Sequence, residues 1–256
     1  DIGSNDGTLL SFYPHWVNRV AFEPAGPMPS HHYDWVRDVP IWDFFSAASY
    51  RFTGLGHKDA KLVTSIAMFY DLDDPNAFVA DLKSILHPEG VWIIEMLHLP
   101  AMLENNAFDT ICHEHLCYYS FRSLKPLVER HGLEVCGVWR KDVNGGSFRI
   151  HVRHATGISY HFEEHDRGSA GAIEAFAERV EDNLNQIRAF IEAKTMLGKT
   201  IAAYGASTKG NTFLEALLWP IEYIADRNPA KVGLKTVGGV PIVSEEDWRF
   251  RRPDYT

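Results

Sequence analysis

Two glycines four residues apart follow an aspartate at the start of the chain, in Asp1-Ile2-Gly3-Ser4-Asn5-Asp6-Gly7. Glycine adopts backbone conformations that other residues avoid, so Gly3 and Gly7 permit a sharp turn and a close approach to a ligand. The next five residues, Thr8-Leu9-Leu10-Ser11-Phe12, are typical of a first helical turn, where free N–H groups can bind a ligand. The run therefore predicts the ligand-binding loop of an α/β domain. Because a domain does not ordinarily begin inside its own binding loop, we expect the chain to be a fragment.

The spacing of this loop indicates which cofactor it binds. A dinucleotide loop reads G-x-G-x-x-G, whereas this run reads D-x-G-x-x-x-G and has no third glycine. The acid at its head suits a cationic, amine-bearing ligand such as S-adenosylmethionine (SAM) better than a pyrophosphate. We expect SAM as cofactor and S-adenosylhomocysteine (SAH) as product, bound by Asp1, Gly3, Ser4, Asn5 and Gly7. A glycine-rich surface turn remains an alternative for the motif alone, because short glycine patterns have low specificity.

The next predicted strand, Arg19–Glu23, is short and apolar and ends in a carboxylate. Open α/β sheets bind ligands at the carboxyl ends of their strands, so Glu23 is the expected acceptor for the ribose hydroxyls. An ordinary surface glutamate before a turn is the alternative. The same argument places the adenine end of the cofactor near Asp38 or Trp42 and the methionine end near Ser65.

Composition narrows the class of partner. The chain has 256 residues, 45% of them hydrophobic, which is enough for one large or two modest domains. Its formal charge of −9 argues against nucleic acid or an anionic membrane as partner, so a small-molecule substrate is expected. Three cysteines without a C-x-x-C pair, Cys112, Cys117 and Cys136, suggest neither a disulfide framework nor a cysteine zinc site. They are compatible with a cytoplasmic location. The sequence does not reveal the oligomeric state.

Strands and helices alternate in the first part of the chain. The pattern predicts, in order, a strand at Lys61–Ile66, a helix at Pro75–Leu86, a turn at His87–Gly90, a strand at Val91–Met96, a helix at Leu124–His131 and an antiparallel pair at Leu133–Arg140 and Gly146–His154. The first four make a βαβ unit. A single long helix is expected over Gly168–Leu197, joining this lobe to a second one.

The second lobe repeats the plan in outline, with predicted strands at Lys199–Tyr204 and Ile221–Asp226. Between them, Gly205–Thr212 is a polar loop that opens a helix, where N–H groups and the Lys209 ammonium could hold a phosphate. The loop lacks the order G-x-x-x-x-G-K-[ST], and a helix start that simply packs between lobes is an equal alternative. The expected organisation is a cofactor domain at 1–156, a connecting helix at 157–197 and a second α/β lobe at 198–256.

Four ordered motifs resemble one family. They are Asp1–Leu10, Phe108–Ser120, Asn144–Arg149 and Tyr204–Thr212, and together they look like the SAM-dependent C-methyltransferases of deoxysugar biosynthesis. The resemblance implies a Rossmann-like α/β SAM-binding lobe followed by a smaller Rossmann-like lobe that helps to hold a nucleotide-linked keto sugar. It also implies an N-terminal zinc-binding domain outside this sequence, so that zinc is not expected in this chain.

The implied reaction places a methyl group on a carbon next to a ketone, which requires a base, a partner for the enolate oxygen and a rigidly held cofactor. By resemblance, His115 matches the general base and Glu114 an orienting or substrate-contacting group. His113 and Tyr70 are further catalytic candidates. The expected substrate-binding residues are Arg149, Tyr204, Ser207, Lys209 and Asn211. A zinc site at the two histidines and a hydrogen-bonded core strand are the alternatives for this motif. In a strand His113 and His115 would share one face, but His-Glu-His lacks the H-E-x-x-H spacing and shows no third ligand nearby.

Two positions depart from the family pattern. Cys112 stands where sugar-acting members usually have a tyrosine, and Phe69-Tyr70-Asp71 stands where they have a histidine. A thiol cannot replace a phenol as an oxyanion donor, whereas Tyr70 could take over part of the histidine's contact. A small buried residue is the simpler interpretation of Cys112. Methylation of nitrogen or oxygen, a nicotinamide oxidoreductase and a non-catalytic binding protein therefore stay open as alternatives.

Overall fold

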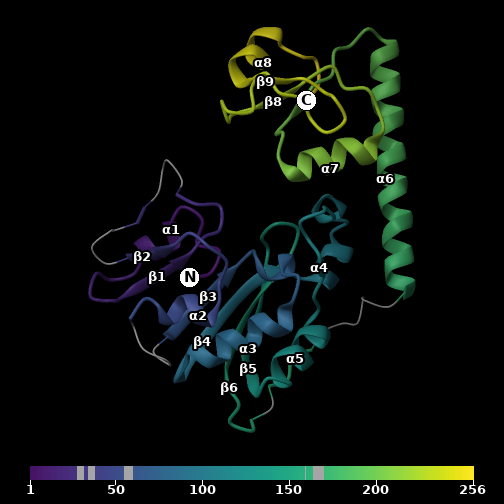
Figure 1. Cartoon of the computed structure of the whole chain (residues 1–256). Helices are drawn as coiled ribbons and strands as arrows, with labels where there is room; N and C mark the ends of the chain where they lie inside the picture. The colour runs from purple at the N-terminus through teal and green to yellow at the C-terminus, as the bar shows by residue number, and fades with distance from the viewer. Residues whose placement is uncertain (28–31, 34–37, 55–59, 159, 164–169) are drawn as a thin grey trace. The chain divides into compact units, whose positions relative to one another are not determined.

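The computed structural model describes residues 1–27, 32–33, 38–54, 60–158, 160–163 and 170–256 (Figure 1). Its internal contacts divide the chain into two compact units. Unit 1 comprises Asp1–Ala101 and Leu116–Asp166, and unit 2 comprises Met102–His115 and Arg167–Thr256. The expected cofactor domain at 1–156 thus differs from unit 1 in two ways: the segment 102–115 belongs to unit 2, and unit 1 extends to Asp166.

Unit 1 is built on a twisted, mostly parallel sheet of the Rossmann-like type. Its strands are β1 (Arg19–Phe22), β2 (Asp38–Ile41), β3 (Ala60–Ile66), β4 (Leu86–Leu97), β5 (Leu133–Lys141) and β6 (Ser147–His154). Strand β2 pairs with β1, and the other four run in the order β3-β4-β6-β5. Ile2 bridges both Phe22 and Ser65, so the start of the chain lies between β1 and β3 and joins the two groups. The predicted antiparallel pair at the end of the sheet is confirmed as β5 and β6.

The helices of unit 1 are α1 (Thr8–Ser11), α2 (Ala47–Arg51), the 3-10 turn η1 (Phe69–Asp71), α3 (Pro75–Ile85) and α5 (Phe121–Glu129). Three of them, α2, α3 and α5, begin at a side chain that accepts hydrogen bonds from their free N–H groups. Asp74 accepts hydrogen bonds from Asn76 and Ala77 at the start of α3, and Pro75 occupies its first turn. A capping box formed by Ser120 and Ser123 starts α5.

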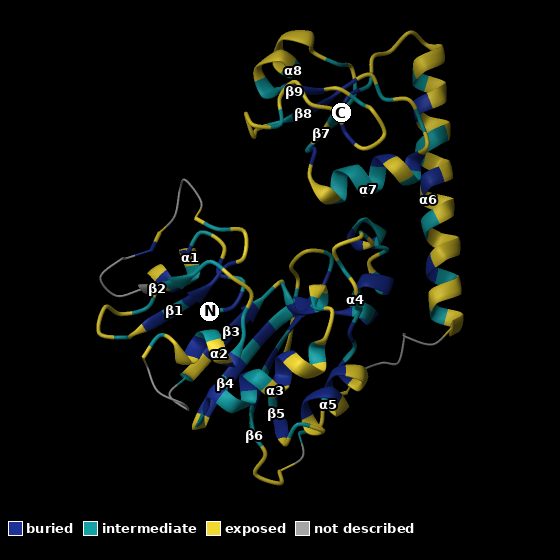
Figure 2. Cartoon of the chain, in the orientation of Figure 1, coloured by how far each residue is buried: buried dark blue, intermediate teal, exposed yellow. Residues whose placement is uncertain are grey.

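The core of unit 1 lies between the sheet and the helices α2, α3 and α5 (Figures 1 and 2). Helix α3 buries Phe78, Val79, Leu82 and Ile85 on one face, and Phe78 packs against the fully buried Trp92 of β4. Burial of one such side chain contributes about 1.5–3 kcal/mol to folding. This packing fixes the strand ends at which the candidate site is found.

The turn expected at His87–Gly90 is wrong. Strand β4 runs through it, and the pairing with β3 shifts from Ala60–Leu86 to Leu62–Val91, so these residues form a bulge. Gly90 is required there because a Cβ atom would lie 2.7 Å from the Ala60 carbonyl oxygen. The glycine that suggested a turn instead permits a close approach between two strands.

Unit 2 holds a smaller parallel sheet of order β7-β8-β9. Its elements are the end of α4 (Leu99–Glu104), η2 (Phe108–Thr110), α6 (Ala170–Met196), β7 (Ala203–Tyr204), α7 (Thr208–Leu217), β8 (Ile224–Asp226), β9 (Ile242–Ser244) and α8 (Glu245–Arg251). The long helix is confirmed, and most of its surface is exposed (Figure 2). In the described part of the chain, no helix is both long and apolar enough to cross a membrane.

Side chains of α6 and α7 hold the segment 102–115 in unit 2. Arg179 donates to the Leu103 carbonyl and to the Asn106 side chain, and Phe108 packs against Phe213. Arg188 donates to the carbonyls of residues 216 and 217 at the end of α7, where a cation also complements the helix dipole. The histidine motif therefore belongs structurally to the same unit as the Gly205 loop.

Candidate active site

The glycine loop at the start of unit 1 adopts the strained conformations that its sequence predicts. Gly3, Asn5 and Gly7 have φ angles of 73°, 51° and 79°. The N–H of Gly3 donates to the Phe22 carbonyl at 2.9 Å, which ties the loop to the end of β1. A Cβ atom on Gly7 would lie 2.7 Å from the ring of Tyr33, so glycine is required at this position for both backbone and space.

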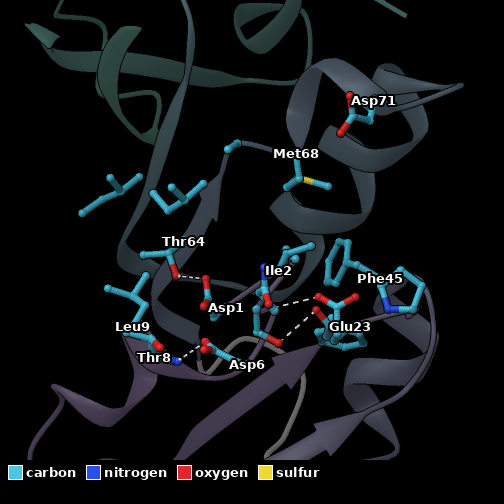
Figure 3. A pocket seen from close by; sticks show the side chains of 18 of the residues that line it. Asp1, Ile2, Asp6, Thr8, Leu9, Glu23, Phe45, Thr64, Met68 and Asp71 are labelled. Atoms are coloured by element: carbon cyan, nitrogen blue, oxygen red, sulfur yellow. Dashed lines mark hydrogen bonds between the residues drawn. The ribbon is translucent and has the colours of Figure 1, made fainter. Parts of the chain in front are cut away.

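Glu23 lies beside this loop at the end of β1, as predicted. Its Oε2 accepts a hydrogen bond from the Asn5 N–H at 2.8 Å, and its Oε1 accepts one from the Ala25 N–H at 2.9 Å. The side chain is buried but lines the cavity beside the loop (Figure 3). Because a carboxylate oxygen has two lone pairs, each oxygen keeps a second acceptor site for a ligand hydroxyl.

The loop and strand ends enclose a cavity of about 970 Å³. This volume lies at the upper end of the range of small-molecule sites. Its described lining carries four carboxylates, those of Asp1, Asp6, Glu23 and Asp71, and a single cationic side chain, Arg149. Figure 3 shows Asp1 meeting Thr64, whose hydroxyl donates to Oδ1 at 2.6 Å. This set of negatively charged acceptors fits a cofactor with a sulfonium and an ammonium group. The apolar lining around Phe45 and Met68 fits an adenine ring.

The prediction for Ser65 is not met. Side chains alternate along β3, so Thr64 and Ile66 line the cavity, while Ser65 is fully buried and accepts the Trp92 indole N–H at 3.1 Å. Trp42 packs edge-on against Tyr33 at 5.5 Å between ring centroids and is not among the described lining residues. The side chain of Asp38 lies outside the described part of the structure.

Arg149 is held at the cavity by a neighbouring strand. It lies opposite Glu95 in the β4–β6 pairing, and its Nε and Nη2 atoms contact Oε2 of Glu95 at 2.6 and 2.5 Å. Ile93, two residues before Glu95 on the same face of β4, also lines the cavity. The arginine predicted to bind substrate thus lies in unit 1, on the lining of this cavity.

Tyr70 lies in η1, between Met68 and Asp71 of the cavity lining. Its backbone carbonyl accepts hydrogen bonds from the N–H groups of Leu116 and Cys117, at 2.9 and 3.0 Å. These two residues directly follow the His-Glu-His motif. Leu116 and Cys117 are therefore anchored beside the cavity of unit 1.

The His-Glu-His motif forms a turn rather than a strand, closed by the His115 N–H and the Cys112 carbonyl. The His113 side chain is 89% exposed and lies 3.7 Å from Glu114. His115 is half-buried. Burial and the nearby Lys209 ammonium lower the pKa of His115, against the opposing effects of the Thr110 backbone and Glu114. A lowered pKa keeps its imidazole neutral and able to accept a proton at neutral pH.

Around the motif, neither a reactive cysteine nor a metal site is indicated by the described residues. Burial and a hydrogen bond with Glu114 raise the pKa of the Cys112 thiol, which favours an inert residue over a nucleophile. Among the described residues, no three histidine, cysteine, aspartate or glutamate side chains gather closely enough to hold a metal ion.

Unit 2 contains a cavity of its own, of about 860 Å³, beside the start of α7. Tyr204, Ser207 and Lys209 line it, as do apolar side chains that include Phe108 and Phe213. Ser207 caps α7 by accepting the Gly210 N–H at 3.1 Å. Asn211, predicted to bind substrate, instead makes hydrogen bonds within unit 2. Its side chain donates to the Ser207 carbonyl and accepts a hydrogen bond from the Val237 N–H at 3.1 Å. It braces the loop.

A family model described as "Methyltransferase domain" matches residues 1–137, more than half of the chain. The chain belongs to the methyltransferase family. A second model, "C-methyltransferase C-terminal domain", matches residues 142–256. C-methyltransferase NovU of Streptomyces niveus is 32% identical over 271 residues, which cover 100% of this chain. The chain spans 64% of the length of that relative.

Solved structures resemble this methyltransferase in fold at low scores. The 1,6-didemethyltoxoflavin-N1-methyltransferase of Burkholderia thailandensis, solved with SAH, is 13% identical with a TM-score of 0.45, covering 60% of this chain and 69% of that one. A Sulfolobus solfataricus protein described as a type 11 methyltransferase is 12% identical with a TM-score of 0.43, covering 64% and 88%. These likenesses carry no argument about substrate or cofactor.

Several residues in or beside the cavity of unit 1 carry no signal in the sequence. Tyr33 braces the loop by donating to the Asn5 carbonyl at 2.7 Å, but no motif marks it. Side chains alternate between the two faces of β3, so Thr64 and Ser65 point to opposite sides. The sequence does not show which of these faces borders the cavity, and Thr64 could therefore not be identified. Met68 and Phe45 reach the cavity only through tertiary packing.

Proposed function

We propose that this protein is a SAM-dependent C-methyltransferase that acts on a nucleotide-linked keto-deoxysugar through an enolate. The observation that carries the proposal is the cavity beside the glycine loop, with Glu23 at the end of β1 and carboxylates along its wall. The match to NovU across the whole chain, together with the C-methyltransferase model over residues 142–256, supports transfer to carbon.

The residues that would hold SAM come from three strand ends. The backbone of Gly3, Ser4, Asn5 and Gly7 approaches the cofactor, Glu23 accepts the ribose hydroxyls, and Asp1 faces its cationic part. Ser65 does not line the cavity and is therefore not proposed to bind SAM, whereas the neighbouring Thr64 does line it. When bound, SAM supplies an electrophilic methyl group, and the C–S electron pair stays on sulfur as the acceptor carbon takes the methyl.

His115 is the proposed general base. It accepts the α-proton of the keto sugar, the C–H electron pair becomes the C=C bond of the enolate, and the carbonyl π pair moves to oxygen. The lowered pKa of His115 keeps it neutral for this step. Glu114 and His113 would orient the turn and contact substrate, and Tyr70, whose carbonyl anchors the following chain, is a further catalytic candidate.

The nucleotide part of the substrate is assigned to the cavity of unit 2. Tyr204, Ser207 and Lys209 line it, and the start of α7 offers N–H groups to a phosphate. Asn211 would act indirectly by bracing the loop. Arg149 is the proposed substrate contact in unit 1.

Two measurements test this function. Calorimetry should show that SAH binds and that NAD does not, and mass spectrometry should show one added methyl group on a nucleoside-diphosphate 4-keto-6-deoxyhexose incubated with SAM. His115→Asn should keep SAH affinity and lose about 10²–10⁴-fold in turnover, the usual scale of general base catalysis. Methyl transfer only to nitrogen or oxygen acceptors, or binding of NAD in place of SAH, would contradict the proposal.

A further inference from the structure

Arg149 and Glu95 form a preorganised pair on the wall of the cofactor cavity. They face each other across β4 and β6, and both contacting nitrogens of Arg149 share one carboxylate oxygen, Oε2. The Glu95 side chain is 15% exposed, whereas that of Arg149 is 42% exposed. A guanidinium has five N–H donors, so the contacts with Glu95 leave donors for a ligand. Glu95 therefore holds the guanidinium of Arg149 in place, while the remaining N–H donors of Arg149 are accessible from the cavity.

The charges around the cavity give this arginine a specific use. Its described lining holds four carboxylates and this single cationic side chain. The carboxylates suit a cationic cofactor, so the guanidinium is the group able to bind an anion. The neighbouring lining residues Ile66 and Ile93 are apolar, and low local polarity strengthens a charge-assisted hydrogen bond.

The proposed reaction creates an anion that needs such a group. As the α-proton leaves, negative charge develops on the carbonyl oxygen of the keto sugar, and donors fixed in advance stabilise it without reorganising. We propose that Arg149 binds this enolate oxygen as a catalytic residue, and that Glu95 is a positioning residue that holds the guanidinium toward it. This inference rests on the proposed carbon methylation and adds a role that the base His115 cannot fill.

Glu95 has a second effect that favours the arrangement. An unpaired arginine in the wall would repel a sulfonium cofactor, since like charges at close range in a partly dry site interact strongly. The Glu95 carboxylate offsets that charge until an anion forms. The pair thus repels the cationic cofactor less than a lone arginine would, and its guanidinium can still stabilise the negative charge of the enolate.

Exchange of the α-proton measures this step without any cofactor. The wild-type protein is incubated in D₂O with a nucleoside-diphosphate 4-keto-6-deoxyhexose, and NMR follows the loss of the α-proton signal. Arg149→Gln should slow exchange about 10²–10³-fold, the cost of removing one oxyanion donor. Arg149→Lys should recover part of the rate, because lysine keeps the positive charge but lacks the planar, two-pronged arrangement of N–H donors of a guanidinium. The Kd for SAH, measured by calorimetry, should stay unchanged in both variants.

Glu95 is tested through its dependence on Arg149. Glu95→Ala should slow exchange about 10²-fold by misplacing the guanidinium. The double variant Glu95→Ala/Arg149→Gln should be no slower than Arg149→Gln alone, because Glu95 acts through that side chain. Arg153 offers a matched control: it lies on the same strand and pairs with Glu134 at 2.9 Å, but does not line the cavity. Arg153→Gln should exchange at the wild-type rate.

The possible outcomes separate the inference from the function on which it rests. Exchange at the wild-type rate in Arg149→Gln overturns the inference. So does a tenfold or greater weakening of SAH binding with exchange intact, because Arg149 would then hold the methionine carboxylate of the cofactor. If the wild-type protein showed no exchange and no methyl transfer, the proposed function itself would be contradicted, and the inference would fall with it.

Discussion

The carboxylate of Glu23 accepts a hydrogen bond from the backbone N–H of Asn5 at 2.8 Å, joining the end of β1 to the middle of the glycine loop. Asn5 is a non-glycine residue with φ of 51°, a conformation that needs such support. The residue proposed to bind the cofactor ribose therefore also shapes the loop that receives the cofactor.

This double role predicts a graded response at Glu23. Glu23→Ala should weaken SAH binding by about 1–3 kcal/mol, because it removes ligand contacts and leaves the N–H groups of Asn5 and Ala25 without this acceptor. Glu23→Gln should weaken it less, since the amide oxygen can still accept one of these hydrogen bonds. Calorimetry with SAH measures both. Equal affinities in Glu23→Ala and the wild-type protein would remove Glu23 from the site.

Space as well as backbone conformation constrains Gly7. Gly7→Ala would place a Cβ atom 2.7 Å from the ring of Tyr33, which braces Asn5. We expect a loss of stability of about 1–3 kcal/mol, the usual cost of overpacking, together with weaker SAH binding as the ring moves.

Gly26 provides the matched control for this substitution. It has a similar φ of 80°, but a Cβ atom there would meet nothing within 4 Å. Gly26→Ala should therefore show only the smaller cost of a left-handed alanine, about 1–2 kcal/mol, and keep its SAH affinity. Thermal unfolding with and without SAH separates the two effects. Similar SAH affinities in the two variants would show that the Tyr33 contact does not shape the site.

Glu134 anchors the chain that follows β6. Its carboxylate accepts hydrogen bonds from the side chain and N–H of Thr156, from Arg153 and from the Gly157 N–H. The contacts with Thr156 and Arg153 lower the pKa of Glu134 to about 2. A carboxyl group with a depressed pKa stabilises the fold above its unfolded pKa of about 4.3, and this contribution is lost as pH falls toward 2.

Glu134→Gln should accordingly lower the Tm at pH 7, and the difference from wild type should shrink below about pH 4.3. Glu129→Gln is a suitable comparison, since Glu129 is an exposed partner of Lys125 on α5 and should change Tm little. Thermal unfolding over a pH series is the measurement. A difference that is constant with pH would mean that ionisation of Glu134 does not stabilise this anchor.

Local features of the site could be predicted from the sequence, because their cause is local. Gly3 and Gly7 are required by backbone conformation, and Glu23 follows from its place at a strand end. The direction in which a side chain points, and the residues that it contacts, depend instead on tertiary packing. The sequence therefore could not assign Ser65 to the core, identify Tyr33 as a brace, or show that the segment around His115 packs with α7.

The grouping of His115 with α7 gives a pH prediction. Burial is the main cause that lowers the pKa of the His115 imidazole, and the Lys209 ammonium, in the same unit, lowers it further. An NMR titration should place the pKa of His115 below its ordinary value of about 6.5, so the imidazole remains neutral into mildly acidic solution. Lys209→Met should raise this pKa, while Lys235→Met, which removes an exposed lysine elsewhere in unit 2, should leave it in place. If activity depends on neutral His115, the acid limb of the kcat/KM profile should move upward in Lys209→Met by the same amount. A titration curve of His115 that does not respond to Lys209→Met would show that burial alone sets its pKa.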